Sequence, residues 1–258
     1  MIGSMTRQME GRVALVTGAA SGIGRAACIR FAGEGAVVAA LDLDLAGLQD
    51  VCAEIVADGG RAIALQVDVT SEPEVEAAVE EVVTVFGRLD SLVACAGHPG
   101  PIAPLADVTV ADWDNVFDIN VKGVWLCAKH AIRAMRPAGG GTIAVMASDS
   151  SYVAAPGIGA YCASKGAVLM LVRSLATDHG AEGIRVNCVS PSIADTPMPR
   201  LVLEAGDRPL SEFGVPDWHT ADEIAGHLLY LCSDACRGLN GSSIIADFGG
   251  MARSTFPV

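Results

Sequence analysis

The stretch VALVTGAASGIG, residues 13–24, sets an apolar run directly before a glycine-rich turn. Glycines in such a turn let the chain bend tightly and bring backbone N–H groups to a bound pyrophosphate at the start of a helix. Glycine-rich turns often serve only to reverse the chain, but here the order strand, turn, helix is the one that binding requires. The residues of this turn that we expect to bind a dinucleotide are Gly18, Ser21, Gly22, Ile23 and Gly24.

Beyond this stretch, short apolar runs alternate with longer segments of helical periodicity. This alternation is typical of repeated βαβ units around a parallel sheet that is covered on both faces. We predict an α/β fold, a single doubly wound, Rossmann-like domain with a parallel sheet of about seven strands and helices on both faces. The expected strands are Val13–Thr17, Val37–Leu41, Ala62–Val67, Ser91–Ala94, Thr142–Met146, Arg185–Val189 and Ser243–Ala246.

One domain suits a chain of 258 residues. Residues 1–10 are expected to form a leader, since Met1–Ser4, ahead of a second methionine at Met5, could be a vector-derived remnant. Residues 11–258 then form the single Rossmann-like domain. The segment at about 191–220 contains five prolines, too many for one regular element, and is expected to be an irregular lid. A helix is expected after Ser71, with Glu74 closing a capping box.

Composition narrows the class of protein. Seventeen basic and thirty acidic residues give a net charge of -13, which disfavours binding to nucleic acid or to anionic membranes. No apolar run reaches membrane-spanning length or resembles a signal peptide. The eight cysteines are scattered among mostly apolar neighbours, and Cys232 and Cys236 lack a second ligand pair. We therefore expect a cytoplasmic protein with no metal site.

Asp42 ends the second expected strand, where a carboxylate can bind the adenosine ribose hydroxyls and repel a 2′-phosphate. This position favours NAD over NADP as the cofactor. Two alternatives remain open. Asp42 and Asp44 could both cap the following helix, and Arg25 could contact a phosphate instead of lying on a solvated helix face.

Tyr161 and Lys165 stand four residues apart on a predicted helix, hence on one face and about 6 Å apart along its axis. A nearby cation favours the phenolate, which brings a tyrosine pKa of about 10 closer to the range where the group exchanges protons in cells. A Tyr–Lys pair is also common on helix surfaces, so the pair alone does not establish a catalytic site.

From Arg12 to about Gly250 the chain resembles the short-chain dehydrogenase/reductase family. The motifs that carry this resemblance are the Thr17–Gly24 turn, Asp68-Val69, Cys95-Ala96-Gly97, Asn120-Val121-Lys122-Gly123, Ser148, the Tyr161/Lys165 pair, and Pro191-Ser192 with Thr196.

The resemblance implies an NAD-dependent enzyme that interconverts a secondary alcohol and a ketone. Tyr161 would exchange the hydroxyl proton, and Ser148, thirteen residues before it, would hold the substrate oxygen, with Ser150 and Ser151 as competitors. Lys165 would contact the nicotinamide ribose and lower the pKa of Tyr161. Asn120 would position a water-linked proton path, although it could instead cap or kink its helix.

The resemblance also implies further cofactor contacts, with Asp68 and Val69 at the adenine and Ile193 with Thr196 at the nicotinamide carboxamide. The remaining implied cofactor-binding residues are Ala96, Gly97, Tyr161, Lys165 and Pro191. The chain departs from the family pattern at Cys95 and Ser192, where asparagine and glycine are usual, and at Phe248, which interrupts the usual Asp-Gly-Gly near the C-terminus. Cys95 is expected to lose a hydrogen bond at the sheet edge.

The expected substrate contacts are His98, Ser150, Ser192 and Met198, because they follow the carboxyl ends of strands or begin the lid. His98 and His219 could instead be solvated turn residues, while Thr220 should cap a helix. The resemblance implies a homotetramer whose subunits pair through two apolar helices, the helix after Asp112 and the helix that bears Tyr161. The residues expected at that interface are Val116, Ile119, Val124, Leu126, Val168, Leu169, Leu171 and Val172, which core burial would explain equally well.

Two other functions are compatible with such a fold. A sensor that binds NAD without chemistry would share it, but would have no use for an intact Ser148, Tyr161 and Lys165. An enoyl reductase is expected to space its tyrosine and lysine more widely than the pair found here. Neither alternative names a substrate.

Overall fold

The computed structural model describes residues 7–215 and 217–252, so the suggested Met1–Ser4 remnant lies outside the described residues. Met9 is already fully buried, and its N–H donates to the carbonyl oxygen of Glu34 at 3.0 Å. Residues just before Arg12 therefore pack within the domain.

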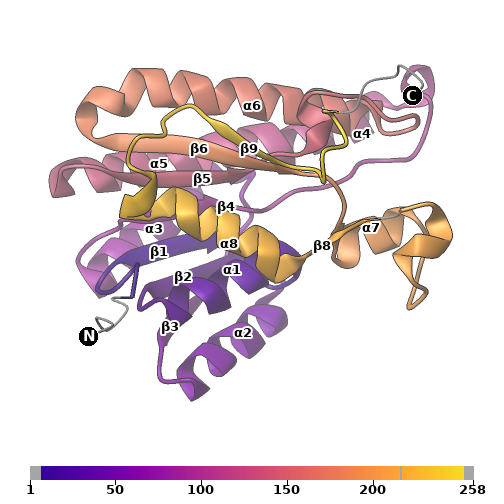
Figure 1. Cartoon of the computed structure of the whole chain (residues 1–258). Helices are drawn as coiled ribbons and strands as arrows, with labels where there is room; N and C mark the ends of the chain where they lie inside the picture. Colours follow the sequence, from indigo (N-terminus) through magenta and orange to yellow (C-terminus); the bar gives the residue numbers. More distant parts are fainter. Residues whose placement is uncertain (1–6, 216, 253–258) are drawn as a thin grey trace.

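A parallel sheet of seven strands forms the centre of the molecule, in the order β3-β2-β1-β4-β5-β6-β9 (Figure 1). The predicted strands are confirmed, with the ends of some shifted by one or two residues. Their bounds are β1 Val13–Thr17, β2 Val37–Asp42, β3 Arg61–Gln66, β4 Ser91–Ala94, β5 Gly141–Met146, β6 Ile184–Pro191 and β9 Ser243–Ala246.

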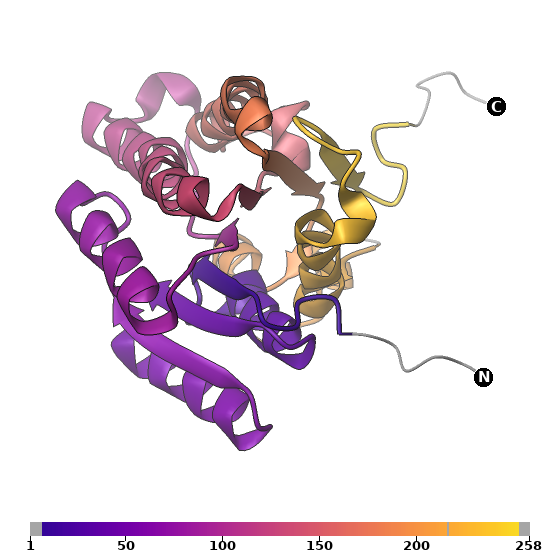
Figure 2. The same cartoon turned by 90° about the vertical axis from the view of Figure 1, so that its left-hand side faces the viewer.

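Helices cover both faces of this sheet, as Figure 2 shows along the strands. In β1, Val13 and Leu15 join one hydrophobic core, while Ala14 and Val16 join the other, as the alternation of a strand requires. One face carries α1 Gly22–Gly33, α2 Leu45–Ala57 and α8 Ala221–Cys232. The other face carries α3 Glu72–Phe86, α5 Val124–Met135 and α6 Gly159–His179. The doubly wound fold is thus confirmed.

Strands β1 and β4 are neighbours although two strands separate them in the chain, so the strand order reverses there. In open α/β sheets, ligands bind outside the carboxyl ends of the strands at this switch point. The Oγ1 of Thr17, at the end of β1, accepts hydrogen bonds from the N–H groups of Cys95 and Ala96 just after β4, both at 3.2 Å. The two strand ends are thereby tied together where a ligand would bind.

Helix α3 begins after Ser71, but the expected capping box is wrong. The Ser71 side chain makes no cap hydrogen bond, and Glu74 turns back to accept from the N–H of Asp68 at 2.9 Å. Thr220 does cap α8, in a capping box with Glu223.

The segment 191–220 is less irregular than expected. It contains β7 Ala194–Asp195, the short helix α7 Pro197–Val202, the 3₁₀ turn η6 Leu210–Phe213 and β8 His219–Thr220. β7 and β8 pair with each other and stand apart from the main sheet. Ala205, Leu210 and Val215 form a small hydrophobic cluster of their own.

Helix α4 (Val110–Phe117) passes into a π-helical turn, η2 (Asp118–Gly123), before α5. Of the eight residues expected at a subunit interface, six are buried in the chain's own core: Val116, Val124, Leu126, Val168, Leu169 and Val172. Packing in the chain's own core accounts for the apolar character of these six residues.

Over residues 7–215 and 217–252, no helix has the length and apolar character that crossing a membrane needs.

Candidate active site

A cavity of about 700 Å³ opens at the carboxyl ends of the strands. Its wall includes all the predicted substrate contacts and cofactor-binding residues, and all the predicted catalytic residues except Asn120. Asn115 and Ile119 also line it. No sequence pattern indicated Asn115, and Ile119, next to the Asn120 motif, was expected at a subunit interface instead. Sequence motifs scattered from residue 18 to residue 198 thus meet in one space.

The glycine turn is packed so closely that side chains do not fit. A Cβ at Gly24 would lie 2.0 Å from the carbonyl oxygen of Gly18, and one at Gly18 would lie 2.8 Å from the backbone nitrogen of Ala96. Gly18 and Gly22 have φ of +65° and +52°, the left-handed region that glycine adopts readily. The turn leads into the N-terminus of the twelve-residue helix α1 and lines the cavity. This backbone cradle fits a pyrophosphate.

Asp42 and Asp44 take different roles. Asp44 caps α2 by accepting from the N–H of Gly47 at 3.2 Å, whereas Asp42 lines the cavity and accepts from the N–H of Ala20 at 3.1 Å. Arg25 forms an ion pair with Glu54 on α2 and is not part of the cavity wall. In the described part of the chain, Lys165 alone supplies a lysine or arginine to that wall. The carboxylate of Asp42 therefore faces a space in which it can accept hydrogen bonds from ribose hydroxyls.

Asp68 and Val69 follow β3 and line the cavity, and their expected contact with adenine stays a prediction. Asp68 Oδ1 accepts from both the N–H and the hydroxyl of Thr70, each at 2.8 Å. A Cβ at Gly123 would lie 2.8 Å from the Cγ2 of Val69, so the glycine ending η2 allows this close contact.

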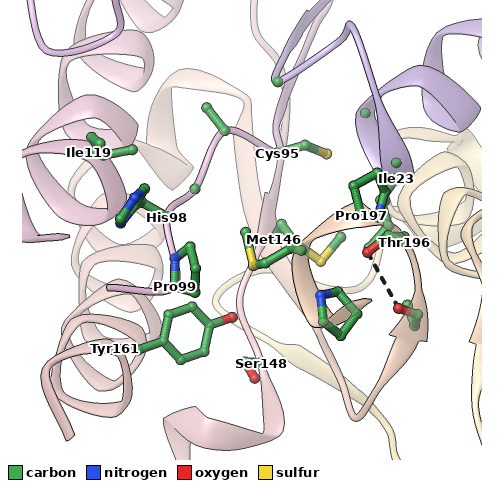
Figure 3. A pocket seen from close by; sticks show the side chains of 18 of the residues that line it. Ile23, Cys95, His98, Pro99, Ile119, Met146, Ser148, Tyr161, Thr196 and Pro197 are labelled. Atoms are coloured by element: carbon green, nitrogen blue, oxygen red, sulfur yellow. Dashed lines mark hydrogen bonds between the residues drawn. The ribbon is translucent and has the colours of Figure 1, made fainter. Parts of the chain in front are cut away.

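Tyr161 lies in the first turn of α6, and its hydroxyl points toward Ser148 (Figure 3). Lys165 lies one turn later, with Nζ 5.5 Å from the centre of the Tyr161 ring and donating to the carbonyl oxygen of Met146 at 2.8 Å. Ser148 follows β5; its hydroxyl donates to Asp149 Oδ1 at 3.0 Å and accepts from the N–H of Ser150 at 3.1 Å. The phenol of Tyr161, the hydroxyl of Ser148 and the ammonium group of Lys165 thus meet in one part of the cavity wall.

The groups of the protein itself do not lower the pKa of Tyr161 as expected. Burial raises this pKa to about 12, the negative charge of Asp149 adds to the rise, and the Ser148 hydroxyl opposes it. Burial also lowers the pKa of Lys165 to about 8. The ammonium group of Lys165 is directed to the Met146 carbonyl oxygen. Burial therefore has the largest effect on the pKa of Tyr161. At neutral pH Tyr161 keeps its proton.

Asn120 is fully buried in η2. Its Oδ1 accepts from the N–H of His98 at 2.7 Å, and its Nδ2 donates to the His98 carbonyl oxygen at 2.9 Å and to Ser164 Oγ at 3.0 Å. π-helical turns often mark functional sites, and this one carries Asn120 to the loop after β4. Asn120 therefore holds the main chain of a cavity residue, and its part in a proton path stays a prediction.

His98 is exposed toward the cavity, and its Nδ1 accepts from the N–H of Gly100 at 3.0 Å. The neutral ring therefore carries its proton on Nε2. His219 is different: it is buried, its Nε2 lies 2.8 Å from the Ala246 carbonyl oxygen, and its ring stacks on Phe248 with centroids 4.1 Å apart. The suggestion that His219 is a solvated turn residue is wrong, because the C-terminal segment covers it.

The three departures from the family pattern have distinct settings. Phe248 has a φ of 53°, unusual for a residue other than glycine. Cys95 packs against the core formed with α1 and α8, and burial raises its pKa to about 12, so it is a neutral thiol. Ser192 lines the cavity, and its N–H donates to the Ala246 carbonyl oxygen at 2.8 Å.

Known proteins are similar to this chain over nearly its whole length. A family model described as enoyl-(acyl carrier protein) reductase matches residues 18–251. D-threitol dehydrogenase of Mycolicibacterium smegmatis is 37% identical over 249 residues, 94% of each chain. Cis-4-hydroxycyclohexanecarboxylate dehydrogenase of Sinomonas cyclohexanicum is 40% identical over 244 residues, 92% of this chain and 96% of that one. A putative NAD(P)-dependent gluconate 5-dehydrogenase from Beutenbergia cavernae with bound NADP superposes with a TM-score of 0.88 at 31% identity, covering 96% of this chain and all of the other.

Proposed function

Because the chain belongs to the short-chain dehydrogenase/reductase family, we propose that it is an oxidoreductase that interconverts a secondary alcohol and the matching ketone, with NAD as cofactor. The observation that carries the proposal is the meeting of Ser148, Tyr161 and Lys165 at one end of a cavity whose other end is the glycine turn. Relatives named as dehydrogenases of hydroxyl compounds support the reaction class. The four-residue spacing of Tyr161 and Lys165 argues against enoyl reduction, despite the description of the family model.

When bound, the nicotinamide would accept or donate the hydride. In ketone reduction, Tyr161 gives its hydroxyl proton to the carbonyl oxygen, which becomes the alcohol oxygen, while Ser148 donates a hydrogen bond that stabilises the developing alkoxide. Alcohol oxidation runs the same path in reverse and needs the phenolate of Tyr161. A positive charge on Lys165 stabilises that phenolate, which is the role we assign to it.

We propose NAD rather than NADP on the strength of Asp42. Its carboxylate lines the cavity, and Arg25, the nearest candidate for binding a 2′-phosphate, is paired with Glu54. A structurally similar protein is described with bound NADP, so we assign the distinction between the two dinucleotides to the side chain at the end of β2 and not to the fold.

Residues 191–220 are proposed to act as the substrate lid. Ser192 and Met198 line the cavity from this segment, and His98 and Ser150 line the same cavity from other loops. The segment is held to the body at both of its ends through the Ala246 carbonyl oxygen, which accepts from the N–H of Ser192 at 2.8 Å and lies 2.8 Å from the Nε2 of His219. Short elements with their own small core suit a segment that moves as a unit.

We also propose a cytoplasmic homotetramer. All eight cysteines are free thiols, as a reducing compartment requires. Exposed apolar side chains on the helices that the family pairs across subunits, Val110, Trp125 and Met170, support association. Light scattering at micromolar concentration tests it, and a monomer mass would refute the tetramer.

Replacing Tyr161 with phenylalanine tests the reaction. We expect turnover of secondary alcohols, followed by the absorbance of reduced nicotinamide, to fall by about 10²- to 10⁴-fold while NAD binding survives, because only the proton-transfer group is lost. Each assay is repeated with NADP. Full turnover in Tyr161→Phe would refute the assignment of Tyr161, a preference for NADP would refute that of Asp42, and tight NAD binding with no turnover by the unaltered enzyme would favour the sensor.

A further inference from the structure

Asp149 follows Ser148 directly and begins the 3₁₀ turn η4 (Asp149–Ser151). Its carboxylate lines the cavity that contains the Tyr161 hydroxyl, and its side chain is half-buried. One oxygen, Oδ1, accepts hydrogen bonds from the hydroxyls of Ser148 at 3.0 Å and Ser150 at 3.4 Å. A carboxylate therefore lies beside the group that has to hold the reacting oxygen of the substrate.

The hydrogen bond to Asp149 uses the hydroxyl proton of Ser148. A serine hydroxyl has one proton to donate, and here it points to Asp149. To stabilise an alkoxide the hydroxyl has to turn toward the substrate, which takes the shorter of the two hydroxyl contacts away from Asp149. A partly buried carboxylate that loses a donor costs free energy unless a new donor replaces it.

The charges of the cavity restrict what the new donor can be. Asp149 repels a carboxylate or phosphate placed next to it. The ammonium group of Lys165, buried nearby against Tyr161, disfavours a second cation in the same space. A neutral hydroxyl on the substrate meets both conditions and can donate to Asp149.

We propose that Asp149 is a specificity-determining residue that selects substrates with a second hydroxyl on the carbon next to the reacting carbinol. The hydroxyl of such a vicinal diol donates to Asp149 and frees the Ser148 proton for the reacting oxygen. A simple alcohol leaves Ser148 divided between Asp149 and the substrate. The inference rests on the proposed alcohol dehydrogenase function and deepens it.

The test compares 2,3-butanediol, in its separate stereoisomers, with 2-butanol, which lacks only the second hydroxyl. For the unaltered enzyme we expect kcat/KM to be at least about tenfold higher for the best diol isomer, since a site that pairs with a substrate hydroxyl discriminates against the analogue without it. In Asp149→Ala, the diol should lose this advantage while turnover of 2-butanol rises, because Ser148 is no longer held by a carboxylate. Asp149→Asn, which keeps a neutral acceptor, should lie between.

Asp50→Asn is the matched control, since it removes the same charge from an exposed position on α2. Opposite changes for the two substrates separate specificity from a folding defect, which would lower both together. The inference is overturned if the unaltered enzyme treats diol and alcohol alike, if Asp149→Ala keeps the ratio, or if both activities fall in parallel. No turnover of either substrate with NAD or NADP would refute the proposed function, and the inference with it.

Discussion

The two ends of the cavity are built from different material. At the cofactor end, the turn from Gly18 to Gly24 is backbone packed on backbone, so closely that a Cβ at Gly24 would lie only 2.0 Å from the Gly18 carbonyl oxygen. At the substrate end, the wall consists of side chains such as His98, Asp149 and Met198, presented by loops and short elements. At the cofactor end, a side chain added at Gly18 or Gly24 would collide with backbone. At the substrate end, each side chain can be replaced singly. One fold can therefore keep its cofactor and change its substrate.

Substitution of Gly24 breaks the cofactor end and should have the largest effect. We expect Gly24→Ala to lower the free energy of unfolding by more than about 4 kcal/mol, or to prevent folding, because the new Cβ meets rigid backbone. Chemical denaturation measures it. Gly33, on the same helix, is the control: a Cβ there meets nothing within 4 Å, so Gly33→Ala should stabilise by about 0.5–1 kcal/mol. Equal stabilities for the two variants would contradict this account of the turn.

Lys165 lies beside Tyr161 in the cavity wall, and replacing it should separate function from stability. Burial holds its pKa at about 8, so keeping the ammonium charged at pH 7 costs about 3 kcal/mol, partly offset by its bond to Met146 O. We expect Lys165→Met to lose turnover yet to raise the free energy of unfolding at pH 7 by about 2 kcal/mol. Denaturation and activity assays on the same preparation measure both.

The way in which the free energy of unfolding changes with pH gives a second check on the pKa of Lys165. Between about pH 8 and 10.5 the unfolded chain keeps the Lys165 proton that the folded chain has released, so the stability of the unaltered protein rises with pH. The advantage of Lys165→Met should therefore shrink by about 2 kcal/mol from about pH 7 to pH 9.5. Exposed Lys122, changed to methionine, should show no such trend. A constant advantage would mean that burial does not depress the Lys165 pKa.

Phe248 provides the smallest expected effect. Like Gly18 it has a positive φ, but it is not glycine, and its ring stacks on His219. Phe248→Gly relieves backbone strain of about 1 kcal/mol and loses a stacking contact of similar size, so stability should change by less than about 1 kcal/mol. Thermal unfolding measures it. A larger loss would show that the C-terminal segment depends on this side chain as strictly as the turn depends on Gly24.

The sequence was sufficient for the features that local patterns determine. Apolar runs located every strand of the main sheet, and the glycine turn and Asp42 were expected in a binding site from their positions after strands. The other expected cavity residues, such as Asp68 and Thr196, came from the resemblance to the family. Patterns failed where a distant segment decides. His219 is buried by the C-terminal segment, a contact that no local pattern indicates. For most of the apolar residues on α5 and α6, the alternative of core burial that the sequence left open is the one found. The pKa of Tyr161 also escaped prediction, because burial is a property of the folded chain.

The π-helical turn at Asp118–Gly123 has a consequence for insertions and deletions. Such a turn contains one more residue than regular α-helix would use over the same length. Removing a single residue there could restore an unbroken helix from α4 to α5, but it would rotate every residue before or after it by about 100° relative to the other part. Asn120 could then no longer hold both the N–H and the carbonyl oxygen of His98. The length of this segment is thus expected to be kept among active descendants of this chain even where its side chains change.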